Sequence, residues 1–264
     1  MTWFKVFDRV SLQEFARIDT LFVASVISIL ALGMVMVSSA SISISESLHG
    51  HPYFFMGRQA FYLVLGLISG FLLLSLPTSQ LQKWGILMMG LSLILLILVL
   101  VPGIGKSVNG SRRWINLVVF NLQASEVAKV CMVVYVSGYL VRRADRVREG
   151  WVGFVLPLCL CSVFLLFLLF EPDFGASVVL LGTVMVLLFL GGAPLYQFLL
   201  LMIAAVAMLG VVAISESYRL KRLMNFIDPW ADPFNEGYQL SQALIAYGRG
   251  EWFGLGLGNS VQKL

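Results

Sequence analysis

Seven long blocks of apolar residues run along this chain, and each is long enough to cross a lipid bilayer. A helix rises about 1.5 Å per residue, so roughly 20 apolar residues span a hydrocarbon core about 30 Å thick. Backbone polar groups find no water partners inside lipid, so each block is expected to form a helix. The seven predicted spans are Thr20–Ala40, Gln59–Pro77, Trp84–Val101, Leu122–Val141, Gly153–Phe170, Phe174–Gly191 and Leu195–Ile214.

The composition excludes a soluble globular domain. Hydrophobic residues make up 59% of the 264 positions and charged residues 12%, and the mean hydropathy is +0.91. A soluble domain needs far more charge to cover its surface. A transmembrane barrel needs alternating segments of about ten residues, whereas Leu93–Leu100 is apolar without alternation. The sequence therefore predicts an all-α, polytopic transmembrane helical bundle.

Lysine and arginine in the short connections predict the orientation of the bundle, because cytoplasmic loops are enriched in both. A cytoplasmic N-terminus places eight of these residues inside and four outside. The predicted organisation is a cytoplasmic segment 1–19, a seven-helix transmembrane region 20–214 and an extracytoplasmic loop 215–264. The inner set is Lys5, Arg9, Arg17, Lys83, Arg142, Arg143, Arg146 and Arg148, and the outer set is Arg58, Lys106, Arg112 and Arg113.

The cations in the outer connection before the fourth span are unexpected under this orientation. Lys106, Arg112 and Arg113 lie close together there. They can extend to lipid headgroups, or they can form an extracytoplasmic site for a phosphate or pyrophosphate. Both interpretations remain open at this stage.

Charged residues also occur at the ends of predicted spans. Glu126 and Lys129 have the i, i+3 spacing that allows a pair on one helix face, either as an interfacial ion pair or as part of a cavity. Glu171 and Asp173 flank Pro172 in a very short connection between two spans. Asp173 suits the N-cap of the following helix, and spacing alone does not make the two carboxylates an acid–base pair.

No metal site is predicted. Two histidines, His49 and His51, share one short loop, and two such ligands alone make a poor site. The three cysteines lie within spans, where they act as small apolar side chains. In the last segment, the Asp-Pro pairs at Asp228 and Asp232 predict turns, and a glycine-rich stretch follows with aromatic residues typical of a loop at the membrane interface.

Taken together, six motifs in this order resemble the SEDS family (shape, elongation, division and sporulation), and the last of them is similar to the FtsW branch of that family. The likeness covers the whole chain. The motifs are Asn109–Ile115, Gln123–Lys129, Glu171–Gly175, Asp228–Phe234, Gly237–Gln242 and Gly254–Leu264.

The resemblance implies a peptidoglycan glycosyltransferase that polymerises lipid II at the outer face of the cytoplasmic (inner) membrane, with roles in cell division, cell shape and cell wall biogenesis at the division septum. Such a reaction needs a base for the attacking hydroxyl and cations for the leaving pyrophosphate. The implied substrate-binding residues are Lys106, Arg112, Arg113, Glu126, Lys129 and Asp173.

The implied partners are lipid II, a class B penicillin-binding protein transpeptidase, other division proteins and membrane lipid, with no nucleic acid. No cofactor is assigned, and a divalent cation is left open. A lipid II flippase or other transporter and a non-catalytic division scaffold are the alternatives.

The main departure from the family is length, because its members have about ten spans. The family's catalytic aspartate would lie beyond Leu264, so no catalytic residue is assigned in this chain, and we expect a C-terminally truncated fragment that is inactive by itself. Asp228 and Asp232 match turn positions of the family and do not replace that aspartate. A second departure is Ala124, where the family usually has proline.

Overall fold

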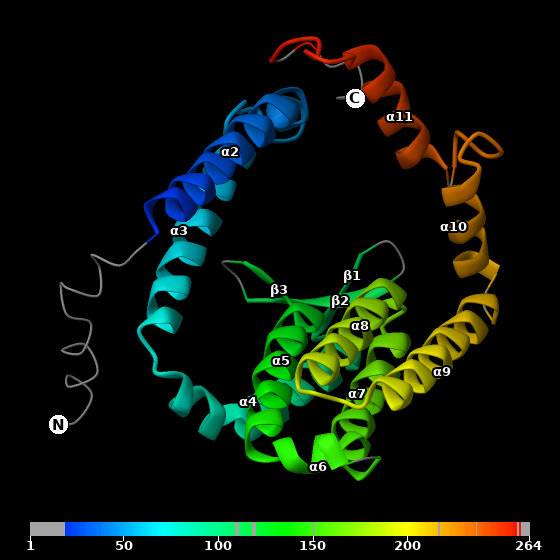
Figure 1. Ribbon diagram of the computed structural model, residues 1–264. Helices are drawn as coiled ribbons and strands as arrows, with labels where there is room; N and C mark the ends of the chain where they lie inside the picture. The colour runs from blue at the N-terminus through cyan, green and yellow to red at the C-terminus, as the bar shows by residue number, and fades with distance from the viewer. Residues whose placement is uncertain are drawn as a thin grey trace. The chain divides into compact units, whose positions relative to one another are not determined.

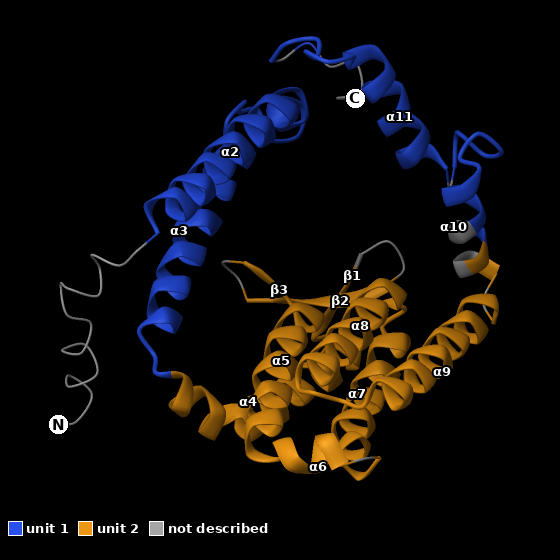
Figure 2. Cartoon of the chain, viewed as in Figure 1, with its two compact units in different colours: residues 1–77, 221–264 blue, residues 78–220 orange. Residues whose placement is uncertain are grey.

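The computed structural model describes residues 19–108, 111–117, 120–149, 151–215, 217–235, 237–257 and 259. The chain divides into two units, residues 1–77 with 221–264, and residues 78–220 (Figure 2). Several predictions lie outside the described residues: the N-terminal cations Lys5, Arg9 and Arg17, residues 109–110 of the first family motif, and residues 258 and 260–264 of the last.

In the first unit, the first two predicted spans form a helix pair, α2 (Thr20–His49) and α3 (Phe54–Leu74), which pack against each other. Asp19 caps α2, accepting hydrogen bonds from the backbone N–H groups of Leu21 (3.0 Å) and Phe22 (3.1 Å). Helix α2 is 30 residues long, so it continues past the predicted end at Ala40 through a serine-rich stretch. Its outer surface and that of α3 carry exposed apolar side chains, as expected for helices that face lipid.

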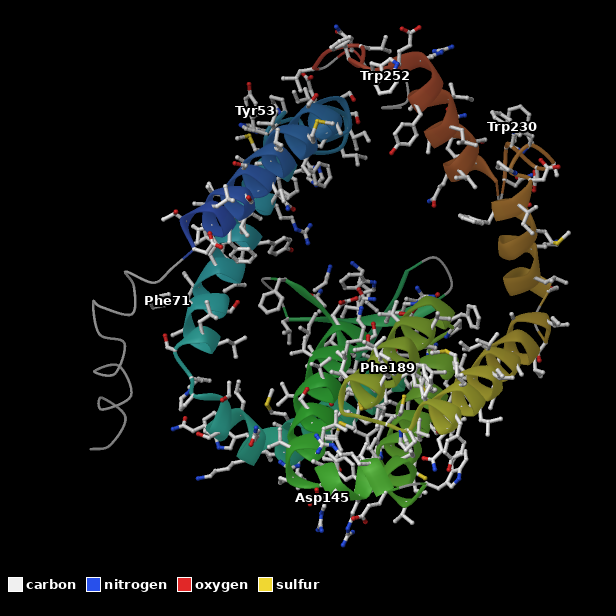
Figure 3. The ribbon with its side chains drawn as sticks, in the orientation of Figure 1. Tyr53, Phe71, Asp145, Phe189, Trp230 and Trp252 are labelled. Atoms are coloured by element: carbon white, nitrogen blue, oxygen red, sulfur yellow. The ribbon has the colours of Figure 1, made fainter. Side chains whose placement is uncertain are left out.

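The second unit contains the remaining predicted spans (Figure 1). A short helix, α6 (Ala144–Glu149), lies between two of them, at the end of the unit where Figure 3 labels Asp145. The long helices are α4 (Thr78–Leu100), α5 (Ala124–Arg142), α7 (Val152–Phe170), α8 (Phe174–Leu190) and α9 (Leu195–Ile214).

The lengths of these helices confirm the predicted all-α, polytopic transmembrane class. Among the described residues, six helices of at least 18 residues are apolar enough to cross a membrane, namely α2, α3, α4, α5, α7 and α9. Helix α8 corresponds to the sixth predicted span and is apolar over 17 residues, a length of about 26 Å.

The core of the second unit lies among α4, α5, α7 and α8. Helix α5 is central, because it packs against α4, α7 and α8. The largest fully buried apolar side chains come from these four helices: Leu96, Met132, Phe154, Phe164, Leu168, Leu180, Met185 and Leu188.

A small three-stranded antiparallel sheet, which the sequence analysis did not predict, covers the end of this core. Its strands are β1 (Gly105–Val108), β2 (Ser111–Asn116) and β3 (Asn121–Gln123), in the order β1-β2-β3. β3 runs directly into α5, so the fourth predicted span, which starts at Leu122, begins within a strand and becomes helical only at Ala124. Ala124 is therefore the first helical residue, the position where proline is favoured but not required.

Gly105 brings the hairpin of β1 and β2 close to the end of α4. A Cβ atom at this position would overlap the backbone carbonyl of Val99 in the last turn of α4. The N–H of Gly105 donates to the carbonyl of Val101 at 3.3 Å. Because Gly105 has no side chain, the start of β1 can lie in direct contact with the end of α4.

The last segment contains two helices that the sequence analysis did not predict, α10 (Ser217–Ile227) and α11 (Tyr238–Gly250). The predicted turns at the two Asp-Pro pairs lie between them and are confirmed: the Asp228 carboxylate accepts from the N–H of Trp230 (3.1 Å), and that of Asp232 accepts from the side-chain amide of Asn235 (3.0 Å). The glycine-rich stretch is helical as far as Gly250, so the loop predicted there is shorter than expected.

Candidate functional site

Arg113 occupies an irregular position in the hairpin. Lys106 pairs with Trp114 and Ser107 pairs with Arg112, so one step along β1 faces two steps along β2. Arg113 is therefore the extra residue of a β-bulge. Bulges redirect a side chain and are frequent beside functional sites.

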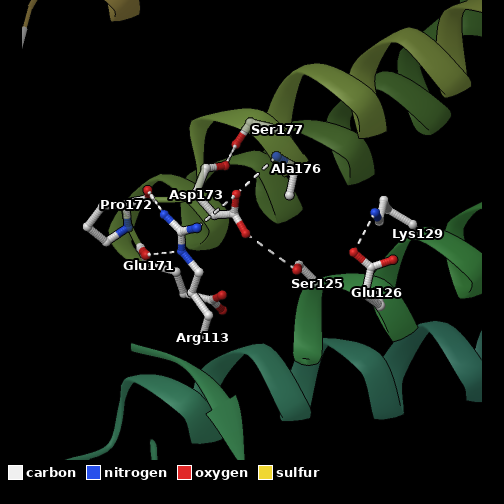
Figure 4. Close-up of polar contacts among 9 residues, drawn as sticks. All are labelled: Arg113, Ser125, Glu126, Lys129, Glu171, Pro172, Asp173, Ala176 and Ser177. Carbon is white, nitrogen blue, oxygen red and sulfur yellow. Dashed lines mark hydrogen bonds and ion pairs between the residues drawn. The ribbon is translucent and has the colours of Figure 1, made fainter. Parts of the chain in front are cut away.

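The guanidinium of Arg113 connects the hairpin to the junction between α7 and α8 (Figure 4). Its Nε donates to the backbone carbonyl of Glu171 at 3.4 Å, and its Nη2 donates to the carbonyl of Pro172. Its Nη1 lies 3.8 Å from Oδ1 of Asp173 in an ion pair whose side chains are 26% and 8% exposed. Three contacts from one side chain thus fix the position of the sheet over the helix ends.

Asp173 joins three elements of the site. Its Oδ1 accepts from the N–H of Ala176 at 3.1 Å, which makes it the N-cap of α8, as predicted. Its Oδ2 accepts from Oγ of Ser125 on α5 at 3.5 Å, a long hydrogen bond. The carboxylate thus caps one helix, contacts a second and pairs with the hairpin, so it orders this end of the bundle.

Glu171 is the unexpected member of the site. Its side chain is fully buried, and neither carboxyl oxygen has a hydrogen-bond partner among the described residues. Burial raises the pKa of this carboxyl from 4.5 to about 8, the Asp173 carboxylate adds to the rise, and Arg113 opposes it. A carboxyl in this position is mostly protonated at neutral pH. The sequence assigns the N-cap to Asp173, but nothing in it predicts that Glu171 is buried without a hydrogen-bond partner.

Glu126 and Lys129 form the predicted i, i+3 pair on α5. Lys129 Nζ lies 2.8 Å from Glu126 Oε1, and the two side chains are 25% and 60% exposed. Figure 4 shows this pair apart from the Arg113 contacts, on the helix that also carries Ser125. Among the described residues, no hydrogen bond or ion pair joins the Glu126–Lys129 pair to Arg113 or Asp173.

Lys106 and Arg112 are the exposed cations of the hairpin. Both side chains are open to solvent, and neither forms an ion pair with any residue that the structure describes. The predicted residues therefore fall into three sets: Arg113 with Asp173, Glu126 with Lys129, and the unpaired cations Lys106 and Arg112. In the described part of the chain, no three His, Cys, Asp or Glu residues are grouped as metal ligands.

A family model and the sequences of known proteins both relate this chain to the same family. Residues 19–264 match the FtsW/RodA/SpoVE family model, described as cell cycle protein. A "Probable peptidoglycan glycosyltransferase FtsW" from Marinomonas mediterranea is 73% identical over 98% of this chain and 64% of the relative. A protein of the same name from Hahella chejuensis is 48% identical over 94% of this chain and 62% of the relative.

Solved structures show the same similarity. A chain from "Structural coordination of polymerization and crosslinking by a peptidoglycan synthase complex" has a TM-score of 0.62 and 30% identity, covering 84% of this chain and 65% of that one. The rod shape determining protein RodA of Thermus thermophilus, in an Asp-to-Ala variant, has a TM-score of 0.58 and 30% identity, covering 71% of this chain and 58% of that one.

The extent of these matches establishes the family, since the family model covers nearly the whole chain. The chain spans 64% and 62% of the lengths of the Marinomonas and Hahella relatives. Its apolar helices and this relationship make it a multi-pass membrane protein. The chain belongs to the FtsW/RodA/SpoVE family of cell cycle proteins.

Proposed function

We propose that this protein is a peptidoglycan glycosyltransferase that polymerises lipid II into glycan strands at the outer face of the cytoplasmic membrane during cell division. The observation that carries the proposal is the 73% identity, over 98% of the chain, to a relative named as such an enzyme. The arrangement of charges at one end of the helical core supports it and indicates where the substrate binds.

The basic hairpin suits the leaving pyrophosphate of lipid II. Lys106 and Arg112 are exposed and unpaired among the described residues, so they are available to an anion. Arg113 adds a third positive charge and holds the hairpin against the helix junction. Fixed cations stabilise the negative charge that develops on a departing phosphate. In this proposal Asp173 orients Arg113, and the Glu126–Lys129 pair on α5 completes the substrate-binding set.

The orientation proposed from the sequence places this site outside. The hairpin and the α7–α8 junction lie at one end of the second unit, and α6 with its cations Arg146 and Arg148 lies at the other (Figure 1). Since arginine-rich connections favour the cytoplasm, the α6 end is the inner end. The N-terminus is then cytoplasmic, and the site opens to the side where glycan strands are made.

A class B penicillin-binding protein is the proposed partner, at the division septum. Support comes from the structural similarity to a chain of a peptidoglycan synthase complex that coordinates polymerization and crosslinking. A polymerase paired with a transpeptidase would supply its product directly to the crosslinking enzyme.

Glycan polymerisation from labelled lipid II, followed on gels, tests the proposed function. Because this chain spans 64% of the Marinomonas relative, the assay compares it with a chimera that adds the rest of the relative's sequence. We expect polymer from the chimera and at least a tenfold lower yield when Lys106→Ala and Arg112→Ala are combined. Lys83→Ala, an exposed cation before the midpoint of α4, is the matched control and should retain full yield.

Two results would contradict the proposal. No polymer from the chimera, even with the partner transpeptidase of the same relative present, would remove the glycosyltransferase assignment. Equal yields from the hairpin variant and the Lys83→Ala control would show that Lys106 and Arg112 do not bind the pyrophosphate.

A further inference from the structure

Four arginines surround α6, at the end of the second unit where Figure 3 labels Asp145. The same stretch contains two acids, Asp145 and Glu149, so at least two positive charges stay unbalanced even if each acid pairs with one arginine. The structure describes all six side chains, and it shows no ion pair among them. The proposed reaction uses none of these cations. The four exposed arginines are Arg142, Arg143, Arg146 and Arg148.

Helix α6 is fixed against α7 by close packing of the backbone. A Cβ atom on Gly153 of α7 would overlap the backbone of Arg146 and Val147, so this contact requires glycine. Val147 is fully buried, and the hydroxyl of Tyr139 on α5 donates to the carbonyl of Gly153 at 3.1 Å. The arginines are therefore carried by a rigid base, which lowers the entropy lost when a ligand binds.

Two of the arginine side chains lie over glycine positions. Nη1 of Arg142 would lie 2.9 Å from a Cβ atom on Gly138, and it donates to the carbonyl of Gln82 on α4 at 3.3 Å. Nε of Arg148 would lie 3.2 Å from a Cβ atom on Gly192, in the turn between α8 and α9. Both guanidinium groups are thus held against neighbouring helices of the same unit.

Exposed apolar side chains border the arginines on both sides in the sequence. Val141 is 67% exposed at the end of α5, and Val152 is 73% exposed at the start of α7, as expected of residues that face lipid. Trp151 is 46% exposed, and tryptophan is enriched at the level of the headgroups. The arginines therefore lie at the boundary between the hydrocarbon and the headgroups, where phosphates are the nearest anions.

We infer that this end of the second unit binds the phosphate headgroup of an anionic phospholipid. A planar guanidinium donates paired hydrogen bonds to phosphate oxygens, and the neighbouring valines offer the apolar surface that acyl chains need. Under the proposed orientation the lipid belongs to the cytoplasmic leaflet, whose surface is anionic and attracts clustered arginines. A soluble phosphate would use only the charges and leave the apolar border without a partner.

Native mass spectrometry of the whole 264-residue chain in detergent tests this inference. Titration with dioleoylphosphatidylglycerol gives the Kd of the first bound lipid. We expect Arg143→Gln combined with Arg146→Gln to weaken binding at least tenfold, equivalent to about 1.4 kcal/mol. Neither side chain forms an ion pair with a residue that the structure describes, so the double variant should fold like the parent.

Asp145→Asn is expected to act in the opposite direction. Asp145 is an exposed carboxylate beside the arginines, and its charge repels a phosphate. Removing this charge should lower the Kd for the same lipid at least twofold. A loss of folding cannot imitate such a gain in affinity.

Two controls separate this site from general attraction between charges. Lys221→Gln combined with Arg249→Gln also removes two exposed cations, but from the last segment of the chain, and should leave the Kd within twofold of the parent. Dioleoylphosphatidylcholine has the same acyl chains and a headgroup without net charge, and should bind at least tenfold more weakly.

Other outcomes would overturn the inference. An unchanged Kd in the folded arginine variant and in Asp145→Asn would show that the residues around α6 do not hold the headgroup. Equal affinity for dioleoylphosphatidylcholine would remove the requirement for charge. Glycerol 1-phosphate that binds as tightly as the lipid would make this a site for soluble phosphate. An acidic peptide that binds through the arginines, while the lipid does not bind, would make this end a protein-docking surface.

Discussion

Arg113 and Glu171 meet at the α7–α8 junction, but only Arg113 has side-chain partners there. Arg113 has three oxygen acceptors, two of them backbone carbonyls, whereas the carboxyl of Glu171 has no hydrogen-bond partner among the described residues. Asp173, two residues after Glu171, takes the ion pair instead. The junction therefore contains one ion pair and one neutral acid, which avoids placing two buried carboxylates beside a single cation.

Replacing Arg113 by lysine tests the importance of the planar guanidinium. Lysine keeps the charge but cannot reach both carbonyls and Asp173 with a single ammonium group. We expect Arg113→Lys to lower the free energy of unfolding by about 1–2 kcal/mol, measured by thermal unfolding in detergent. Arg112→Lys, at the neighbouring exposed position, should change it by less than about 0.5 kcal/mol. Equal effects at both positions would contradict the contacts assigned to Arg113.

The buried carboxyl of Glu171 predicts a pH dependence of stability. Its pKa in the folded protein is about 8 against an ordinary 4.5, so between these values the folded state binds more protons than the unfolded state. Its contribution to stability is fully present below pH 4.5 and is lost as the pH rises through about 8. The slope approaches about 1.4 kcal/mol per pH unit within this window.

Glu171→Gln should remove most of this slope, because glutamine stays neutral. Unfolding of parent and variant in detergent, measured from pH 5 to pH 9, gives the comparison. Glu126→Gln, which changes a carboxyl that is 60% exposed, is the control and should keep the slope of the parent. A parent that becomes more stable with rising pH, relative to Glu171→Gln, would show that Glu171 is ionised when folded.

At the level of elements, the hairpin depends on two different attachments. Arg113 fastens β2 to the α7–α8 junction, and Gly105 brings β1 against the end of α4. The hairpin therefore bridges parts of the bundle that are distant in sequence. Its unpaired cations, Lys106 and Arg112, are thus held in place by contacts that other residues make.

Gly105→Ala tests the second attachment. The added Cβ would overlap the carbonyl of Val99, so β1 must move away from α4. We expect a loss of about 1–3 kcal/mol of stability and a lower polymer yield from the chimera. Gly90→Ala, in α4 with no atom within 4 Å of the added Cβ, is the control and should leave both values unchanged or slightly improved. Similar losses from both variants would argue against close packing at Gly105.

The amino-acid sequence predicts the helices better than it predicts the site. Hydropathy predicts α7 to its last residue, because an apolar block of that length has no other structure available in lipid. It could not predict strands of four, six and three residues, whose pairing depends on partners elsewhere in the chain. The Glu126–Lys129 pair follows from helix spacing alone. Arg113 and Asp173 are 60 residues apart in sequence, so local spacing could not indicate their contact. Spacing also could not indicate that Asp173 would be paired and Glu171 left unpaired.

For the whole molecule, the proposed orientation can be measured directly. Single cysteines at Lys106→Cys and Arg146→Cys, both exposed positions, are introduced after the three native cysteines are replaced by serine. A membrane-impermeant maleimide should label Lys106→Cys in cells with a permeabilised outer membrane, and Arg146→Cys only after lysis. The reverse pattern would invert the orientation and place the basic hairpin in the cytoplasm.

The length of α2 has a mechanical consequence for the protein in its membrane. Thirty helical residues measure about 45 Å, and a hydrocarbon core about 30 Å thick leaves roughly 15 Å of helix beyond it. The final turns contain serines and Glu46, and the Ser45 hydroxyl closes the link to α3 by bonding the carbonyl of His51 and the N–H of Phe54. A bilayer measures about 40–45 Å with its headgroup layers, so a helix of this length reaches from one headgroup layer to the other. The polar link between α2 and α3 then lies among headgroups and water, where its remaining backbone groups find hydrogen-bond partners.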